Sequence, residues 1–193
     1  MSQEFVKIST GFTISWDINK IEEQFVNVEI PKGVQIHNDP LKRPHWQTYT
    51  SSTISFARNF FHNFPAECNE VAEQLRVIQQ AAIANHQLID KFLSHTISAE
   101  NTGIIKVLAG DSVGAHCDIT RNISINIGLK NSNAGTTFIS NNKNIEEFWQ
   151  QNLSSYTMQD GDVYLLQVEN SHAVKSNVNK DSGLCRYIIT YTM

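Results

Sequence analysis

The sequence has few cysteines and no long hydrophobic run. Its three cysteines, Cys68, Cys117 and Cys185, lie far apart in the 193 residues and form no Cys-x-x-Cys pair. This usage argues against a disulfide framework and against a structural zinc site, so we expect reduced thiols. No apolar run approaches the roughly 18 residues that span a bilayer, and the opening stretch MSQEFVKIST lacks the apolar segment of a signal peptide. We therefore expect a cytoplasmic protein with no membrane partner.

The sequence also lacks an excess of charge of either sign. Its 15 basic and 19 acidic residues give a formal net charge of −4, and neither sign forms a long run. A nucleic-acid backbone is therefore not expected as a partner. A small or weakly charged substrate fits this composition better.

Proline is scarce and is confined to the first third of the chain. The segment 31–46, PKGVQIHNDPLKRPHW, holds three of the four prolines and many polar residues, and it predicts an extended loop. Ahead of it, FVKI and FTISW predict short strands, and DINKIEEQFV predicts one short helix with Asp17 as its cap.

One long stretch of the sequence has helical periodicity. Between Pro65 and His95, apolar residues recur on one broad face, at Val71, Leu75, Ile78, Ala82, Leu88 and Phe92. Pro65 suits the first turn, and Glu67 and Glu70 suit the positive end of the helix dipole. The pattern predicts a helix that braces one face of a sheet.

Eight short β-like runs separated by turns fill the chain beyond residue 100. They are GIIKVL, VGAHCD, NISINIGL, GTTFIS, SSYTM, DVYLLQV, HAVKS and LCRYIITYTM. Only NIEEFWQQ interrupts them, as a short helix or helical turn. This pattern predicts a mainly β sandwich or barrel with flanking helices. At this length we expect a single domain over 1–193, with N-terminal strands, loop and supporting helix in 1–100 and the β core in 103–193.

A histidine and a carboxylate stand two positions apart in AHCDITRNISINIGL, residues 115–129. In a strand, His116 and Asp118 project from one face while Cys117 points away. Two such side chains are costly to desolvate unless they are paired, and a metal ion would pair them. The best candidate for a third ligand is His172, just after DGDVYLLQVENS, from a strand antiparallel to the first. Two imidazoles and one carboxylate leave about three coordination positions open, which is typical of non-haem Fe(II) rather than of closed zinc sites.

The last β-like run, LCRYIITYTM, contains an arginine at a position that an alternating strand would bury. A buried arginine requires an anionic partner, because the guanidinium does not give up its charge. A dicarboxylate cosubstrate would provide that partner for Arg186.

The order H-x-D, a long gap, H and then R in the last strand resembles the Fe(II)/2-oxoglutarate-dependent dioxygenase superfamily. NISINIGL followed by GTTF, and DGDVYLLQVENSHAV followed by SGLCR, are similar to its aspartyl/asparaginyl hydroxylase-like and prolyl hydroxylase-like branches. The resemblance covers roughly residues 103 to 193, and the first hundred residues match no motif that we can name. It implies a jelly-roll core, also called a double-stranded β-helix, of the cupin-like kind.

The resemblance also implies roles for individual residues. His116, Asp118 and His172 would be the catalytic iron ligands, and Arg186 would hold the distal carboxylate of 2-oxoglutarate through two charge-assisted hydrogen bonds. Hydroxylation of an unactivated C–H bond would then be coupled to oxidative decarboxylation of 2-oxoglutarate to succinate and CO2. O2 is the second cosubstrate, and ascorbate is a candidate reductant.

Two further residues are candidates for the metal-proximal end of the cosubstrate, Asn126 and, with weaker support, Arg121. Asn126 could instead be an ordinary strand residue, and Arg121 could face solvent at the turn ITRN. Cations and aromatics in LKRPHWQTY, within the segment 31–52, could cover a substrate or simply form a surface loop. Trp149 is expected to pack its helix on the barrel. The remaining histidines lack ligand spacing and are not expected to bind metal: His37, His45, His62, His86 and His95.

Three functions are consistent with this sequence. The first is a 2-oxoglutarate oxygenase that hydroxylates an amino acid or a residue in a peptide or protein. A cupin-type metalloenzyme without 2-oxoglutarate would share the barrel, but it would ordinarily carry a histidine-rich metal set and need no Arg186. A jelly roll that survives as an inactive binding module is disfavoured, because all three ligands and the arginine are present. The substrate and the oligomeric state stay open, since specificity lies in variable loops.

Overall fold

The computed structural model of the protein describes residues 4–9, 47–50, 53–57, 67–97, 102–118 and 121–192. Several sequence predictions lie outside these ranges. They are the strand FTISW, the helix DINKIEEQFV, the loop 31–46, the helix start at Pro65, and His37, His45 and His62.

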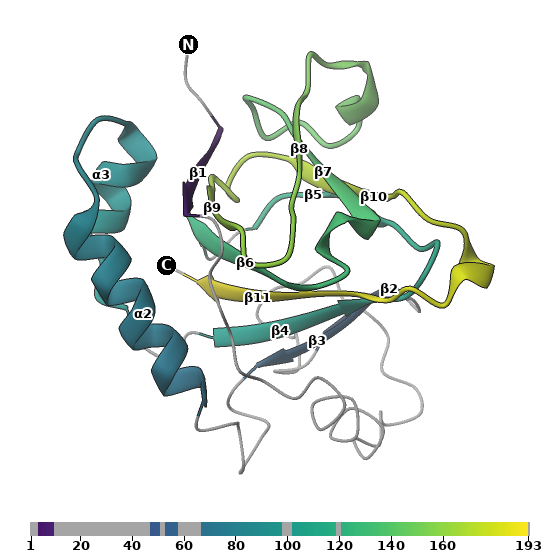
Figure 1. Ribbon diagram of the computed structural model, residues 1–193. Coiled ribbons are helices and arrows are strands. Elements are labelled where there is room, and N and C mark those ends of the chain that lie inside the picture. The colour runs from purple at the N-terminus through teal and green to yellow at the C-terminus, as the bar shows by residue number, and fades with distance from the viewer. Residues whose placement is uncertain are drawn as a thin grey trace.

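Two antiparallel sheets form the body of the described chain (Figure 1). The larger sheet has the strand order β1-β9-β6-β11-β4-β3-β2 and the smaller one the order β5-β10-β7-β8. The bounds of the larger sheet are β1 Phe5–Ser9, β9 Val163–Leu166, β6 Ser124–Lys130, β11 Arg186–Thr192, β4 Thr102–Val107, β3 Thr53–Ala57 and β2 Gln47–Thr50. Those of the smaller are β5 Val113–His116, β10 His172–Ser176, β7 Gly135–Ile139 and β8 Ser154–Thr157. All eight β-like runs beyond residue 100 form strands, and the predicted jelly-roll fold class is confirmed.

The central strands of the larger sheet have two different buried faces. In β11, Ile189 and Tyr191 belong to a core that also contains helix residues, whereas Ile188 belongs to a second core between the sheets. β6 repeats the pattern, with Ile125 and Ile127 on the helix side. Because side chains alternate along a strand, one apolar run can supply both cores. The positions between the sheets are the ones available to a functional site.

Two helices cover the outer face of the larger sheet: α2, Glu67–Ala81, and α3, Gln87–Ser94 (Figure 1). The expectation of one continuous helix from Pro65 to His95 is wrong in this respect. The helical path stops after Ala81, and His86 adopts an extended conformation and caps α3, its Nδ1 accepting from Leu88 N at 3.1 Å. A capping side chain that binds its own backbone favours a new helix start over continuation. The predicted apolar face is nevertheless buried, with Val71, Leu75, Leu88 and Phe92 all in the core.

Short 3-10 turns complete the described chain: η4 Ser132–Ala134, η5 Phe148–Gln150 and η6 Lys180–Ser182. NIEEFWQQ forms only the turn η5. Its Trp149 packs on Phe138 of β7 with ring centroids 5.4 Å apart and an edge-to-face angle of 69°, which confirms the predicted packing on the barrel.

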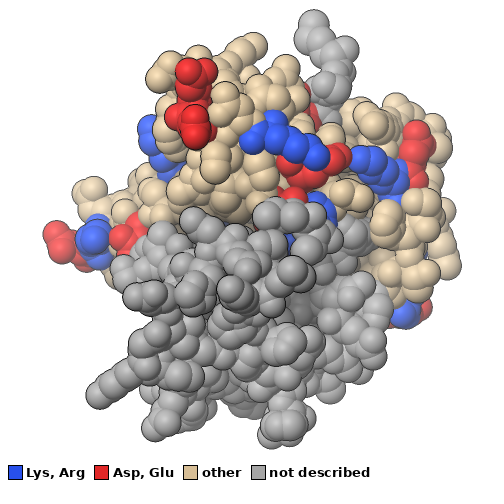
Figure 2. Space-filling view, turned by 180° about the vertical axis from the view of Figure 1, so that it is seen from behind, with Lys and Arg blue, Asp and Glu red and all other residues tan. Residues whose placement is uncertain are grey.

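Charges of both signs are interspersed over the described part of the face in Figure 2. This distribution agrees with the modest net charge of −4. No helix among the described residues has the length and apolar character needed to cross a bilayer.

Candidate metal centre

The smaller sheet brings together the three residues that the sequence predicts as ligands. His116 ends β5, Asp118 follows it in extended chain, and His172 begins β10. The two strands are antiparallel, and His172 stands directly opposite His116 in the register. Residues 56 positions apart in the chain therefore become cross-strand neighbours.

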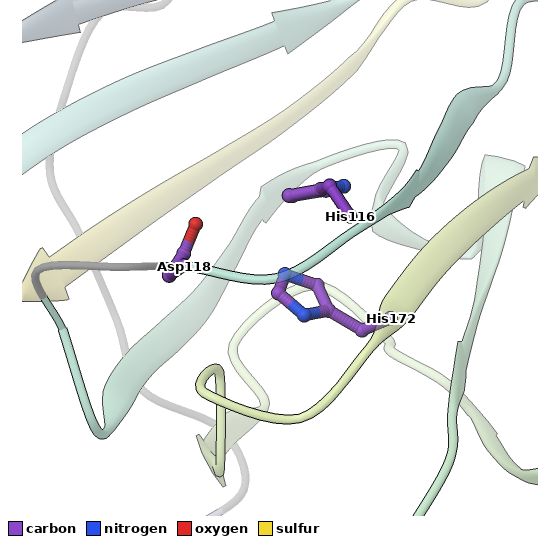
Figure 3. Close-up of side chains that lie close together, drawn as sticks. All are labelled: His116, Asp118 and His172. Carbon is purple, nitrogen blue, oxygen red and sulfur yellow. The ribbon is translucent and has the colours of Figure 1, made fainter. Parts of the chain in front are cut away.

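The three side chains point toward one another (Figure 3). Their ligand atoms, one per residue, all lie within 4.8 Å of one another. A single point then lies within about 2.8 Å of all three, compared with about 2.0–2.2 Å for a metal bond to imidazole or carboxylate. The imidazole centroids are 4.2 Å apart. The described residues contain no other group of three or more metal-binding side chains that meets this distance.

Both imidazoles are oriented through their Nδ1 atoms. His116 Nδ1 lies 2.8 Å from the carbonyl of Gly114, and His172 Nδ1 lies 2.9 Å from the carbonyl of Asn170. Because a carbonyl can only accept, each Nδ1 carries the proton and each Nε2 carries the lone pair. This is the arrangement in which a protein usually presents histidine to a metal.

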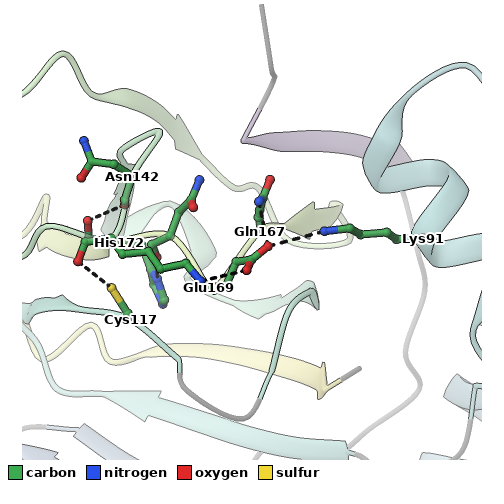
Figure 4. A network of polar contacts seen from close by, with 9 residues as sticks. Lys91, Cys117, Asn142, Gln167, Glu169 and His172 are labelled. Atoms are coloured by element: carbon green, nitrogen blue, oxygen red, sulfur yellow. Dashed lines mark hydrogen bonds and ion pairs between the residues drawn. The ribbon is translucent and has the colours of Figure 1, made fainter.

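A tight turn beside the cavity contacts two of the three predicted ligands. The turn Gln167–Asn170 is closed by Asn170 N donating to Gln167 O, and its Val168 carbonyl accepts from Asp118 N at 2.9 Å. Its other end supplies the carbonyl that binds His172. Glu169 within the turn accepts from Gln167 and pairs with Lys143 and Lys91, so the turn is linked to a loop and to α3 (Figure 4).

Cys117 stands between His116 and Asp118 and faces the opposite side, as predicted. Its thiol donates to the Lys143 carbonyl at 3.3 Å, in the same outer network (Figure 4). Burial raises the pKa of this thiol. A thiol with a raised pKa is a weaker nucleophile at neutral pH.

His172 is held in its neutral form. Burial lowers its pKa to about 4, and the neighbouring His116 acts in the same direction, while Asp118 opposes the shift. Since only the neutral imidazole binds a metal, this environment keeps His172 competent for coordination at neutral pH.

Arg186, at the start of β11, is 3 % exposed and has no acidic partner among the described residues. Its Nε donates to the Ser132 carbonyl at 3.1 Å, and one Nη contacts the Met158 sulfur at 3.8 Å. Burial lowers the pKa of Arg186, opposed by Tyr156, but a guanidinium stays charged in proteins. A buried cation without a counter-ion is costly, and the described residues do not supply the anion that would offset this cost.

Tyr156, which the sequence gave no reason to select, lies behind the cavity wall, next to Asn126, Thr137 and Arg186. Its hydroxyl is buried and makes no hydrogen bond of acceptable geometry within the described structure, although Asn126 and Thr137 lie near it. Burial raises its pKa, and those two side chains together with the Arg186 cation oppose the rise. A buried hydroxyl without a hydrogen-bond partner therefore lies near a buried guanidinium, and both groups can donate to an acceptor. SSYTM carries only a β signal, so no sequence motif could have identified it.

The two remaining candidates also face the interior. Asn126 of β6 lines the cavity, and its side-chain amide oxygen, Oδ1, accepts a hydrogen bond from Ser124 Oγ at 3.0 Å. Arg121 lines it as well, with one Nη 2.7 Å from Asp118 Oδ2. His86 and His95, predicted not to be ligands, cap α3 away from this cavity.

One cavity connects these groups. Its volume is about 80 Å³, and it is lined by the three predicted ligands together with Arg121, Asn126 and Arg186. Most of its remaining wall is aliphatic, from Ile105, Val107, Val113, Leu166, Val168, Val174 and Ile188. The three predicted metal ligands and the Arg186 guanidinium therefore line one and the same cavity.

No protein-family model matches the chain, and no curated protein matches it in sequence. Solved structures do match. SnoN, an α-ketoglutarate-dependent non-haem epimerase from nogalamycin biosynthesis, has a TM-score of 0.59 at 8% identity, covering 98% of this chain and 76% of SnoN. HygX from Streptomyces hygroscopicus, solved with nickel, 2-oxoglutarate and hygromycin B, has a TM-score of 0.53 at 9% identity, with 99% and 82% covered.

A prolyl hydroxylase from Trichoplax adhaerens, in complex with a hypoxia inducible factor peptide, has a TM-score of 0.51 at 10% identity, with 98% of this chain and 82% of that chain covered. At these identities the likeness establishes the fold. The jelly-roll fold that the sequence resemblance implied is thereby confirmed, because the chain shares it with these solved structures.

Proposed function

We propose that the protein is an Fe(II)- and 2-oxoglutarate-dependent dioxygenase that hydroxylates a C–H bond of an amino acid or a peptidyl residue. The observation that carries this proposal is the joint presence, in one cavity, of a two-histidine, one-carboxylate cluster and a buried arginine without an acidic partner. Neither feature alone would distinguish this class from other metal sites or from a structural cation.

The donor set fits Fe(II). Two neutral imidazoles and one carboxylate on one side of an ion leave positions for a chelating cosubstrate and for O2. When bound, iron would supply the oxygen activation and the removal of hydrogen that amino-acid side chains lack. His116, Asp118 and His172 would hold it, with the Gly114 and Asn170 carbonyls orienting the imidazoles.

The arginine that lines the same cavity fits a dicarboxylate. Arg186 would bind the distal carboxylate of 2-oxoglutarate through a charge-assisted pair, and the Tyr156 hydroxyl would donate a further hydrogen bond. Asn126, from the neighbouring strand, would contact the metal-proximal end. The aliphatic wall between them would exclude water from the reacting centre.

The deciding experiment is succinate formation from 2-oxoglutarate by the iron-loaded protein, with ascorbate, across panels of free amino acids, peptides and other small metabolites. Substrate-stimulated succinate together with a product 16 Da heavier would support the proposal. Metal binding with no succinate on any panel would favour a cupin-type enzyme without 2-oxoglutarate. Absence of both would favour a binding module.

A variant at the centre sharpens this experiment. His172→Ala should abolish metal binding and turnover while the fold persists, because His172 lies at the start of β10 and its side chain lines the cavity. His95→Ala is the matched control, since that imidazole contacts the Lys91 carbonyl at the end of α3 and does not line the cavity. Retained metal binding in His172→Ala would remove His172 from the site.

A further inference from the structure

We propose that Arg121 is a positioning residue for the metal centre, which fixes the Asp118 carboxylate so that only one of its oxygens is offered to the metal. The inference rests on the proposed metal site. It differs from the role that the resemblance suggests for Arg121, which is direct contact with the cosubstrate.

The contact between the two side chains is short and largely withdrawn from solvent. One Nη of Arg121 lies 2.7 Å from Asp118 Oδ2, and the exposed fractions of the two side chains are 24 % and 5 %. In addition, Asp118 N donates to the Val168 carbonyl at 2.9 Å. Asp118 is therefore held both at its backbone and at its carboxylate, and the two contacts together restrict its side-chain conformation.

Charge explains why the pair is needed before any metal arrives. A carboxylate this deeply buried is strongly destabilising unless a cation or hydrogen-bond donors compensate it. Arg121 is the only cation that forms an ion pair with Asp118 in the described parts of the chain. Arg121 stands three residues after Asp118, in the segment between β5 and β6.

Geometry explains what the pair does once a metal is bound. A carboxylate can bind a metal through one oxygen or through both, and the second mode would occupy a position that a chelating cosubstrate or O2 requires. Because Oδ2 pairs with Arg121, we assign Oδ1 to the metal. Partners of metal ligands that act in this way typically change metal affinity 10–100-fold when they are removed.

The same chain offers a matched control. Arg76 pairs with Glu73 at the same sequence spacing of three residues, at 2.6 Å, but on the exposed surface of α2. Arg76→Met removes an arginine and an ion pair as Arg121→Met does, and it also loses the hydrogen bond from Arg76 to the Ile97 carbonyl at 3.0 Å, all outside the cavity. Differences between the two variants therefore report on the contact with Asp118.

The test measures Co(II) binding without 2-oxoglutarate, by titration calorimetry and by the intensity of the visible Co(II) bands, which reports coordination number. We expect Co(II) affinity 10–100-fold weaker in Arg121→Met, with altered band intensity, and unchanged in Arg76→Met. Arg121→Lys keeps the charge but loses the planar fork, so its affinity should be intermediate. If Arg121→Met does not fold, Arg121→Lys against Arg76→Lys carries the same comparison.

Equal Co(II) affinity and spectra in the Arg121 and Arg76 variants would overturn the inference. A weaker affinity for 2-oxoglutarate with unchanged Co(II) binding would also overturn it, in favour of direct cosubstrate contact. Because these measurements use no turnover, failure of succinate formation alone would refute the oxygenase and leave the test of Arg121 intact. A wild-type protein that binds no Co(II) would refute the metal centre and this inference together.

Discussion

Replacing Arg186 by methionine should separate cosubstrate binding from folding. The guanidinium is 3 % exposed, and the only hydrogen bonds it makes within the described structure are to the Ser132 carbonyl and the Met158 sulfur. Methionine fills a similar volume without charge. The substitution loses one ordinary hydrogen bond, about 1 kcal/mol, and removes an uncompensated buried cation. The free energy of unfolding of the metal-loaded protein without 2-oxoglutarate should therefore stay within about 1 kcal/mol of wild type, or rise.

The effect on 2-oxoglutarate should be far larger. Leaving one carboxylate buried without its cation costs about 3 kcal/mol or more, which is a factor of at least about 100 in affinity. At a ligand concentration of 100 times Kd, wild type gains about 2.7 kcal/mol. For a chain of this length that gain raises Tm by about 5–10 °C. The same ligand concentration should leave Tm of Arg186→Met nearly unchanged.

The assay is calorimetric melting with redox-inert Mn(II) in the site, with and without 2-oxoglutarate, and with Arg76→Met as the control. A wild-type-like shift in Arg186→Met would refute the assignment of Arg186 to the cosubstrate. A large loss of stability before ligand is added would show that the guanidinium has a structural role instead.

The remaining predictions concern neighbours of this arginine and the acid response of the metal centre. Tyr156→Phe removes a buried hydroxyl that lacks a partner, so the protein should keep its stability, while titration calorimetry should show about tenfold weaker 2-oxoglutarate binding. Gly135→Ala places a Cβ 3.3 Å from Arg186 Cδ and 3.0 Å from Val174 Cγ1, and should weaken 2-oxoglutarate several-fold without altering Co(II) affinity; unchanged affinity for both would contradict it. The metal-free protein should lose stability as pH falls from about 6.5 to about 4, because unfolded His172 takes up a proton that the folded state, with its pKa lowered to about 4, rejects. The loss approaches about 3 kcal/mol in denaturant melts, and His172→Phe should flatten this slope.

Local pattern predicted a large part of the fold. The eight β-like runs became strands, and the apolar face of residues 71–92 became the core side of α2 and α3. These features depend on periodicity and on side-chain chemistry, which neighbouring residues encode. The break between the two helices was missed, because the cap at His86 depends on an extended conformation that no helical periodicity reveals.

The sequence by itself also determined the chemistry of the site: two imidazoles, a carboxylate and an arginine in a terminal strand. Only the tertiary structure decided that these groups meet, through the antiparallel register that sets His172 opposite His116. It alone showed the orphaned Tyr156 hydroxyl and the pairing of Arg121 with Asp118. The physical reason is that residue type fixes what a side chain can bind, whereas burial and partners depend on strands distant in the chain.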